Sequence, residues 1–405
     1  MSHRTDPVFQ TVDWLLGQRG GTDGPDKALS ALWSKQGRNW AGGRVVLAEA
    51  GPIRYLPYEW AGVEVRGEYA SAGGTAASTP LMTMLHVHAD PSRAAREFEA
   101  GLARVVVAAG DPMPVSLLRD RIVVWAAVGE PDPGALSDLV DEASWRDCDA
   151  QLATAIADWR GCAPPVLVRW SPLERAVFIR DRPDGGGRYR VELDTNGHRA
   201  AETALAMSEM ANAVAASGTN LELPRMIRYC PEAHALVTTE LEGTSMVDLL
   251  PRLRPGGFAA VGAAIAELHR LPTIPLEGWS INVARSDLRE RMLRISRAVP
   301  RLADRVAAVG ELLDKGAEQL PPVMPRPIHG NLTADRVLCR TNPESGARRV
   351  AVAGRRARRS GDPHHDLGRL VAHLLLVDAV ARIGERRLAD RLRALLEGYQ
   401  GGVGA

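Results

Sequence analysis

Two short stretches in the last fifth of the chain carry the residues whose types and spacing could do chemistry. They are residues 329–338, which read HGNLTADRVL, and residues 361–367, which read GDPHHDL. The carboxylate of Asp335 could accept a proton, whereas the amide of Asn331 has no basic site at neutral pH. Arg336 is always positively charged, so it would repel a metal ion placed beside it.

The pair of stretches resembles the two active-site loops of the aminoglycoside phosphotransferases and choline kinases, a group related to the protein kinases. In that family the first loop reads His-Gly-Asp, four further residues, Asn or Gln, and Val-Leu. The second has an Asp seven positions before a Gly-Asp-Pro-x-x-Asp-Leu run. Here Asn331 stands at the catalytic Asp, Arg336 at the metal-binding Asn or Gln, and Gly354 at the metal-binding Asp. The resemblance implies a kinase-like phosphotransferase fold with its reactive groups replaced.

These replacements remove the groups on which phosphoryl transfer depends. The family reaction needs a carboxylate to accept the hydroxyl proton, two metal ligands, and a lysine for the nucleotide phosphates. Asp335 could substitute for Asn331 as the base. The only lysines are Lys27, Lys35 and Lys315, and none lies in a segment that could form the third strand of an N-lobe. We therefore expect no magnesium site and no ordinary nucleotide anchor.

Other residues of the two stretches have roles in the fold rather than in the reaction. The resemblance implies that His329 braces the first loop and that Asp366 links the second loop to the His-Gly turn. Asp362 precedes Pro363 and is typical of a turn. His364 and His365 are adjacent, so they would not face one metal ion, and we expect no metal site there.

The elements that must position these loops follow a repeated order. Strand-like runs at 44–48, 62–66, 81–87 and 121–125, with a helix around 93–98, predict a kinase N-lobe, and the same order returns after residue 164. Arg54, Pro57, Glu59 and Ala61 match Arg169, Pro172, Glu174 and Ala176 at a constant offset of 115 residues, and Arg93 matches Arg199 at an offset of 106. These matches favour an internal duplication, although chance sharing of turn residues by two β-rich segments is the alternative.

The fold class is therefore predicted to be α+β, a protein-kinase-like bilobal fold with an additional N-lobe-like domain in front. The expected units are a degenerate N-lobe-like domain over 1–163, an N-lobe over 164–245 and a helical C-lobe over 246–405. Apolar stripes, including one over 286–315, predict amphipathic C-lobe helices that pack in the core.

The resemblance also locates the nucleotide-binding lysine and its glutamate partner. The lysine position falls on Glu192 in the second copy and on His86 in the first, and Glu209 stands where the family carries the glutamate. Two facing acids would repel, so Glu192 and Glu209 should either point to solvent or recruit arginines.

An arginine run follows Gly354. Arg355 and Arg356 begin it, and three interpretations stay open: a solvated basic loop, a metal-independent site for a nucleotide or phosphate that also uses Arg336, or a surface for a partner. Nucleic acid is not expected, because the net charge is +1 and no aromatic residues interleave the arginines.

The composition limits the location of the protein. No apolar run long enough for a membrane helix occurs, and the first residues lack the apolar core of a signal peptide. The four cysteines are far apart in sequence and suggest neither a metal site nor a disulfide, so a cytoplasmic protein is expected.

The sequence thus favours a catalytically degenerate member of the phosphotransferase group, a pseudokinase that needs no cofactor and acts as a binding partner or scaffold. The expected partner is a protein, such as an active kinase paralogue or an enzyme of the same pathway. Two alternatives remain: an active enzyme of altered chemistry on a small molecule or peptide, and a binding protein that sequesters a ligand.

Overall fold

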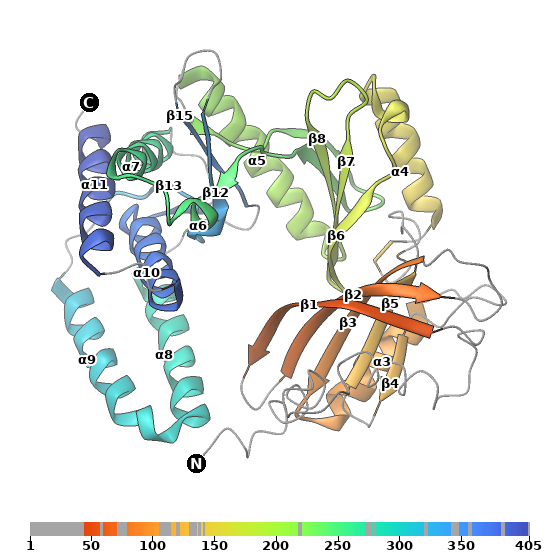
Figure 1. Cartoon of the computed structure of the whole chain (residues 1–405), viewed down its shortest axis with the longest axis horizontal. Coiled ribbons are helices and arrows are strands. Elements are labelled where there is room, and N and C mark those ends of the chain that lie inside the picture. Colours follow the sequence, from red (N-terminus) through yellow and green to blue (C-terminus); the bar gives the residue numbers. More distant parts are fainter. Residues whose placement is uncertain are drawn as a thin grey trace.

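The chain folds into two antiparallel sheets followed by a mainly helical part (Figure 1). We describe it from a computed structural model. The described residues are 44–56, 60–70, 79–104, 115–118, 122–128, 136, 139–140, 142–217, 221–271, 278, 280–319, 323–341, 348–354, 359–381 and 385–403.

The first sheet has five strands, and one helix lies between its third and fourth strands in the chain. Its elements are β1 (Arg44–Leu56), β2 (Trp60–Ala70), β3 (Thr79–His88), α3 (Pro91–Arg104), β4 (Val115–Leu118) and β5 (Ile122–Val128). The strands lie in the order β1-β2-β3-β5-β4, and neighbouring strands are antiparallel. The helix follows the third strand, as the sequence predicts for an N-lobe.

The second sheet has the same plan. It consists of β6 (Val166–Ser171), β7 (Arg175–Asp181), β8 (Arg188–Asp194), α5 (Gly197–Ser217), β10 (Met226–Cys230) and β11 (Ala235–Thr239). Its strand order is β6-β7-β8-β11-β10, again antiparallel throughout. A helix again follows the third strand, here with the short strand β9 (Leu221–Glu222) before the fourth.

The two sheets also share their register. Equivalent cross-strand pairs are Tyr55–Ala61, Ala61–Val87 and Val87–Ile122 in the first sheet and Trp170–Ala176, Ala176–Leu193 and Leu193–Ala235 in the second. The offset of 115 residues found in the sequence therefore relates β1 to β6 and β2 to β7, and the offset of 106 relates β3 to β8 and α3 to α5. Common descent of the two sheets stays a prediction, and Pro57 and Glu59 lie outside the described residues.

A single apolar core joins the two sheets. Helix α4 (Glu142–Ala155) and the turn η3 (Trp159–Gly161) contribute Trp145, Leu152 and Trp159 to it. Trp125 of β5 meets Trp170 of β6 edge to face, with ring centroids 6.3 Å apart. The first sheet is therefore packed against the second rather than tethered to it by a bare linker.

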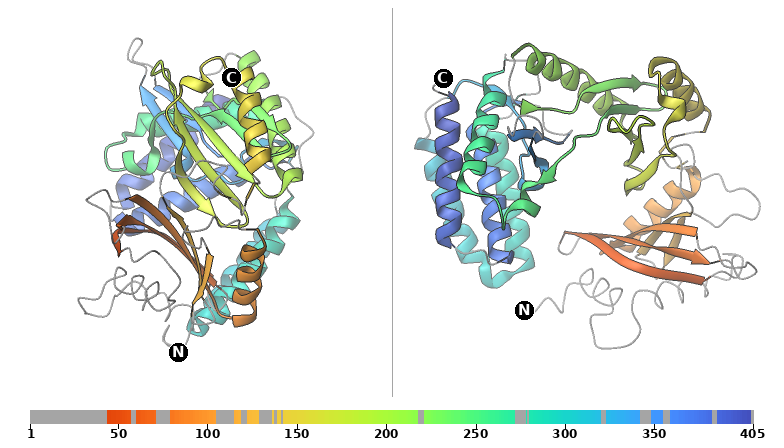
Figure 2. Two further views of the ribbon diagram at one scale, coloured as in Figure 1. Left: turned by 90° about the vertical axis from the view of Figure 1, so that its right-hand side faces the viewer. Right: turned by 45° about the horizontal axis from the view of Figure 1, so that its top comes forward.

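The C-terminal part combines helices with short strands. Its elements are β12 (Thr244–Ser245), α6 (Met246–Leu249), α7 (Pro255–Arg270), α8 (Ile281–Ala298), η4 (Pro300–Leu302), α9 (Ala303–Gln319), β13 (Arg326–Ile328), η5 (Ala334–Arg336), β14 (Val337–Thr341), β15 (Arg348–Val352), β16 (Arg359–Gly361), α10 (His364–Ala381) and α11 (Glu385–Val403). Helices α7 and α11 lie side by side (Figure 2), and a Cβ added to Gly262 would come within 2.0 Å of the Leu395 carbonyl oxygen. The α+β bilobal architecture predicted from the sequence is thus confirmed.

The expectation that the apolar stripe over 286–315 packs in the core was wrong. The stripe over 286–315 belongs to a hairpin of α8 and α9 in which α9 has no buried residue, because the two helices bury only the seam between them. Cys148 on α4 and Cys230 on β10 are far apart in sequence, but their thiols interact inside the core. Among the helices that the structure describes, none is long and apolar enough to cross a membrane.

Candidate functional site

The loop that follows β13 is held by one buried carboxylate. Asp366, in the first turn of α10, accepts hydrogen bonds from the backbone N–H groups of His329 and Gly330, at 2.5 and 2.7 Å. His269 Nε2 donates to the same carboxylate at 3.2 Å, and its Nδ1 lies 3.0 Å from the Tyr399 hydroxyl. Burial raises the pKa of Asp366, but the His269 hydrogen bond and the nearby His329 outweigh it, so this pKa lies below its usual value. Asp366 therefore fixes the His-Gly turn, the role that the resemblance implies.

His329 connects this loop to the loop after β15. Its Nδ1 accepts the Asn331 backbone N–H at 3.3 Å, so its Nε2 can carry the proton and donate to the Ala353 carbonyl oxygen at 3.2 Å. The imidazole is buried. These bonds hold His329 against the position that precedes Gly354.

Gly354 leaves no room for a side chain. Its φ is +131°, a conformation that favours glycine, and a Cβ built there would lie 2.8 Å from His329 Nε2 and 3.2 Å from Arg336 Nη1. The guanidinium group of Arg336 therefore lies beside the backbone of Gly354. Gly354 and Arg336, which stand at the two metal-binding positions of the family, are therefore in contact, and Arg336 brings a fixed positive charge there.

The remaining residues of the first loop differ in their surroundings. The Asn331 side-chain oxygen is buried and has no hydrogen-bond partner among the described residues. Asp335 is exposed and lies on η5 at the floor of a cleft of about 320 Å³ between the second sheet and the loops. Asp335 is thus the accessible carboxylate of this loop, four residues after the position where the family has its base.

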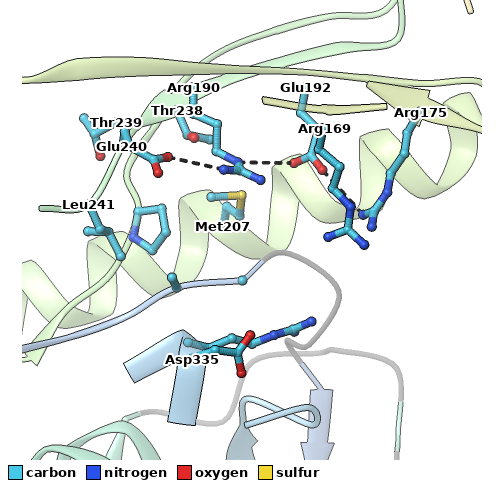
Figure 3. Close-up of a pocket in the computed structure, with 14 residues that line it drawn as sticks. Arg169, Arg175, Arg190, Glu192, Met207, Thr238, Thr239, Glu240, Leu241 and Asp335 are labelled. Atoms are coloured by element: carbon cyan, nitrogen blue, oxygen red, sulfur yellow. Dashed lines mark hydrogen bonds and ion pairs between the residues drawn. The ribbon is translucent and has the colours of Figure 1, made fainter. Parts of the chain in front are cut away.

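The roof of this cleft is rich in arginine (Figure 3). Glu192 on β8 is buried and lies 3.6 Å from Arg175 Nη1 and 3.9 Å from Arg190 Nε, while Arg190 Nη1 lies 3.4 Å from the Glu240 carboxylate. The sequence left two possibilities for Glu192, exposure to solvent or pairing with arginines, and the structure shows the pairing. Opposite charges balance this carboxylate where the family places a lysine.

Glu209 does not meet Glu192. It is half-buried on α5 and is absent from the cleft lining, to which α5 contributes Met207 instead.

At the equivalent positions of the first sheet, the described residues are mainly apolar. The pair Met84–Trp125 there corresponds in register to Arg190–Thr238 in the second sheet, and a Cβ on Gly101 of α3 would lie 2.6 Å from the Trp125 ring. His86, at the lysine position, binds Glu97 of α3 instead, with its Nδ1 2.6 Å from the carboxylate. Apolar packing and this pair fill the face that is polar in the second sheet.

Sequence reasoning missed the arginines of the roof. Arg169, Arg175 and Arg190 come from β6, β7 and β8 and line the same cleft. Arg190 could have been found, because residues two apart on a strand share a face and Glu192 was already a candidate. Arg169 and Arg175 could not, since their meeting depends on the pairing of separate strands.

The remaining candidate residues are the arginine run after Gly354 and the adjacent histidines of the second loop. Arg355 and Arg356 lie outside the described residues. His364 binds Asp362 through its backbone N–H and its Nδ1, both at 2.8 Å, and His365 Nε2 lies 3.1 Å from the Gly330 carbonyl oxygen. Within the described part of the chain, no cluster of three or more His, Cys, Asp or Glu side chains could hold a metal ion.

Comparison with known families supports the sequence resemblance. Residues 170–350 match the sequence model of the phosphotransferase enzyme family. The matched segment is similar to that family over less than half of the chain. It runs from β6 to β15, so it contains the second sheet, the cleft roof and the loop of residues 329–336, whereas the first sheet lies outside it.

Several solved structures are similar to the chain at low identity. A choline/ethanolamine kinase family protein from Mesorhizobium loti is 21% identical, with a TM-score of 0.42 over 64% of this chain and 76% of that protein. ADP-bound aminoglycoside phosphotransferase APH(2'')-Ib is 13% identical, with a TM-score of 0.43 and coverages of 64% and 82%. APH(3'')-Id from Streptomyces rimosus is 20% identical, with a TM-score of 0.36 and coverages of 63% and 98%. The chain matches no curated protein.

Proposed function

We propose that this chain is a catalytically degenerate phosphotransferase-family protein that acts by binding a partner rather than by transferring phosphate. The observation that carries this proposal is the packing of Gly354 against His329 and Arg336. A metal-binding carboxylate at position 354 would need a Cβ where the imidazole and guanidinium groups already lie. The fold of the family is kept, and the space for its metal ligand is not.

The other two positions agree with this proposal. Kinase-type catalysis places a carboxylate within hydrogen-bond reach of the acceptor hydroxyl and neutralises the phosphates with magnesium. Asn331 supplies an amide in place of that carboxylate, and its oxygen is buried. Glu192 supplies a negative charge in place of the lysine. Four groups that act together in the family are changed here, and three of them, Glu192, Arg336 and Gly354, line one cleft. Such groups are not individually dispensable.

The hairpin of α8 and α9 supports the protein-partner part of the proposal. Arg285 and Arg289 of α8 bind Asp314 of α9, which joins the two helices. The hairpin nevertheless leaves large apolar side chains in water, with Leu312 70% exposed and Leu293 58% exposed. Large apolar side chains exposed on two neighbouring helices are consistent with a protein-binding surface. This surface is separate from the cleft.

A turnover assay tests the loss of catalysis. Purified chain is incubated with ATP and Mg²⁺, alone and with aminoglycosides, amino sugars or maltose, and released ADP is measured. We expect no magnesium-dependent turnover above that of a heat-denatured sample. The matched variant is Asp335→Ala, which removes the accessible carboxylate of the cleft floor. Magnesium-dependent turnover that disappears in Asp335→Ala would contradict the proposal and assign the role of base to Asp335.

A further inference from the structure

We propose that an acidic segment of a protein partner docks in an arginine-lined groove between the second sheet and the start of α7. The groove consists of two cavities that share Arg340 of β14, and we call it the arginine groove. The proposal goes beyond the proposed function, because docking here does not depend on whether the cleft transfers phosphate.

The two cavities have volumes of about 640 and 400 Å³. The first lies at the ends of β8, β10 and β11, and its lining includes Arg188 at the start of β8 and Arg225 just before β10. The second lies beside β12, and its lining includes Arg252 and Arg254 from the segment that joins α6 to α7. Because Arg340 lines both cavities, one elongated ligand can occupy them together.

Part of the charge that lines the arginine groove is balanced within the protein. Two lining arginines and one further lining carboxylate have partners of opposite charge. The pairs, with their N–O distances, are Arg340–Glu242 at 2.8 Å, Arg182–Asp158 at 2.9 Å and Arg190–Glu240 at 3.4 Å. These groups therefore add little net charge for a ligand.

The remaining lining charges leave an excess of positive charge. Glu222 is half-buried and makes no ion pair with the residues that the structure describes. Four exposed arginines also make none with the described residues, namely Arg188, Arg225, Arg252 and Arg254. The excess is present at both ends of the groove. A partner with carboxylates along its chain complements this distribution.

The start of α7 adds to the attraction for a carboxylate in the second cavity. The helix begins after Arg254 with no side-chain cap and no acidic residue in its first turn, and a helix N-terminus carries partial positive charge. Arg391 of α11 lies close to this turn, with its guanidinium group 5.7 Å from the Phe258 ring. It is buried, and its Nη1 has no hydrogen-bond partner among the described residues. A carboxylate at the start of α7 would therefore be favoured by the helix N-terminus and by both arginines.

Apolar side chains lie among the arginines and favour a peptide over a free inorganic anion. Leu223 and Ile227 line the first cavity, and Leu249 and Leu253 line the second. A segment that combines acidic and apolar residues can use both features, whereas an inorganic anion can use only the charge. The arginines at both ends also require a ligand long enough to reach them.

Fluorescence anisotropy on the full chain tests the inference. The probe is a short fluorescein-labelled peptide of Glu and Asp with interspersed leucines, and the control peptide has Gln and Asn in place of Glu and Asp. We expect saturable binding of the acidic peptide and none of the neutral peptide. The affinity should fall with salt, because exposed charges are screened over about 8 Å at physiological ionic strength.

Two double variants test the two ends of the groove. Arg188→Gln with Arg225→Gln removes the charge of the first cavity, and Arg252→Gln with Arg254→Gln removes that of the second. Each should weaken binding of the acidic peptide about tenfold, because each removes charge-assisted contacts. All four substitutions together should weaken it about a hundredfold, since contacts at separate sites add.

The matched control is Arg93→Gln with Arg96→Gln on α3. Both arginines are exposed and make no ion pair with the described residues, so this variant changes the net charge equally at a distant place. It should bind the acidic peptide within about twofold of wild type. Thermal unfolding of each variant confirms that it is folded.

Several results would overturn the inference: no saturable binding of the acidic peptide, equal binding of the neutral peptide, or an equal loss in the α3 control. A loss confined to one of the two groove variants would also overturn it, because it would indicate a single anion site. Tighter binding of a single-stranded oligouridine than of the peptide would indicate a nucleic-acid site instead. Peptide binding together with magnesium-dependent turnover would refute the proposed function alone, and the absence of both would refute this inference alone.

Discussion

Substitution of Gly354 by alanine should destabilise the C-terminal part of the protein. The backbone there has a φ of +131°, and holding a non-glycine residue in such a conformation costs about 1–3 kcal/mol. The added Cβ would also lie 2.8 Å from His329 Nε2 and 3.2 Å from Arg336 Nη1. His329 cannot easily move away, because it is buried and bonded through both ring nitrogens. Overpacking of this kind typically costs a further ~1–3 kcal/mol.

The sum is a loss of about 3 kcal/mol or more in the free energy of unfolding, which corresponds to a fall in Tm on the order of 5–10 °C for a unit of this size. Differential scanning calorimetry measures it. Gly316→Ala is the matched control, because Gly316 lies in the exposed helix α9 with no atom within 4 Å of an added Cβ. That substitution should leave Tm unchanged or raise it, since alanine favours helix over glycine by up to about 1 kcal/mol.

A double variant separates the two contributions. Arg336→Ala combined with Gly354→Ala removes the contact at 3.2 Å but keeps the contact with His329 and the strained φ. It should therefore recover only a small part of the lost stability. If Gly354→Ala alone is as stable as wild type, position 354 has room for a side chain, and the argument that the metal ligand cannot be restored fails.

Two further predictions concern buried carboxylates. Asp366→Asn should lower the free energy of unfolding at neutral pH by about 2–4 kcal/mol, because it weakens charge-assisted bonds to two backbone N–H groups and His269. The pKa of Asp366 is lower in the folded than in the unfolded state. The stabilisation that its ionised form provides is therefore present above about pH 4 and is lost as pH falls through the folded pKa. Urea unfolding at several pH values should show the stabilities of wild type and Asp366→Asn converging in acid, and a stability difference that grows in acid would contradict this reasoning. Glu97→Gln should loosen the first sheet, because Glu97 binds His86, His88 and the Trp125 indole N–H, and these bonds outweigh burial to hold its pKa well below the usual value. Hydrogen exchange should then rise in β3 and α3, and unchanged exchange in both elements would contradict this reasoning.

Local spacing in the sequence was enough to locate the loops of the site. His329, Asn331, Arg336 and Gly354 stand at fixed distances from one another along the chain, and the structure brings all four to one place. The repeated order of strands and helix could be predicted for the same reason. A strand, a turn and a helix are encoded by neighbouring residues. Residues that match at offsets of 115 and 106 in the sequence therefore occupy equivalent positions in the strand pairs of the two sheets.

The tertiary structure decided which charges meet. Arg169 and Arg175 line the cleft because β6 pairs with β7, and the buried Glu192 is paired there with Arg175 and Arg190. Cys148 and Cys230 meet because α4 packs on the second sheet. Leu293 of α8 and Leu312 of α9 remain exposed although the two helices pack on each other. Periodicity along the chain reports that a helix has an apolar face, but not whether another element covers it, because that depends on contacts between residues far apart in sequence.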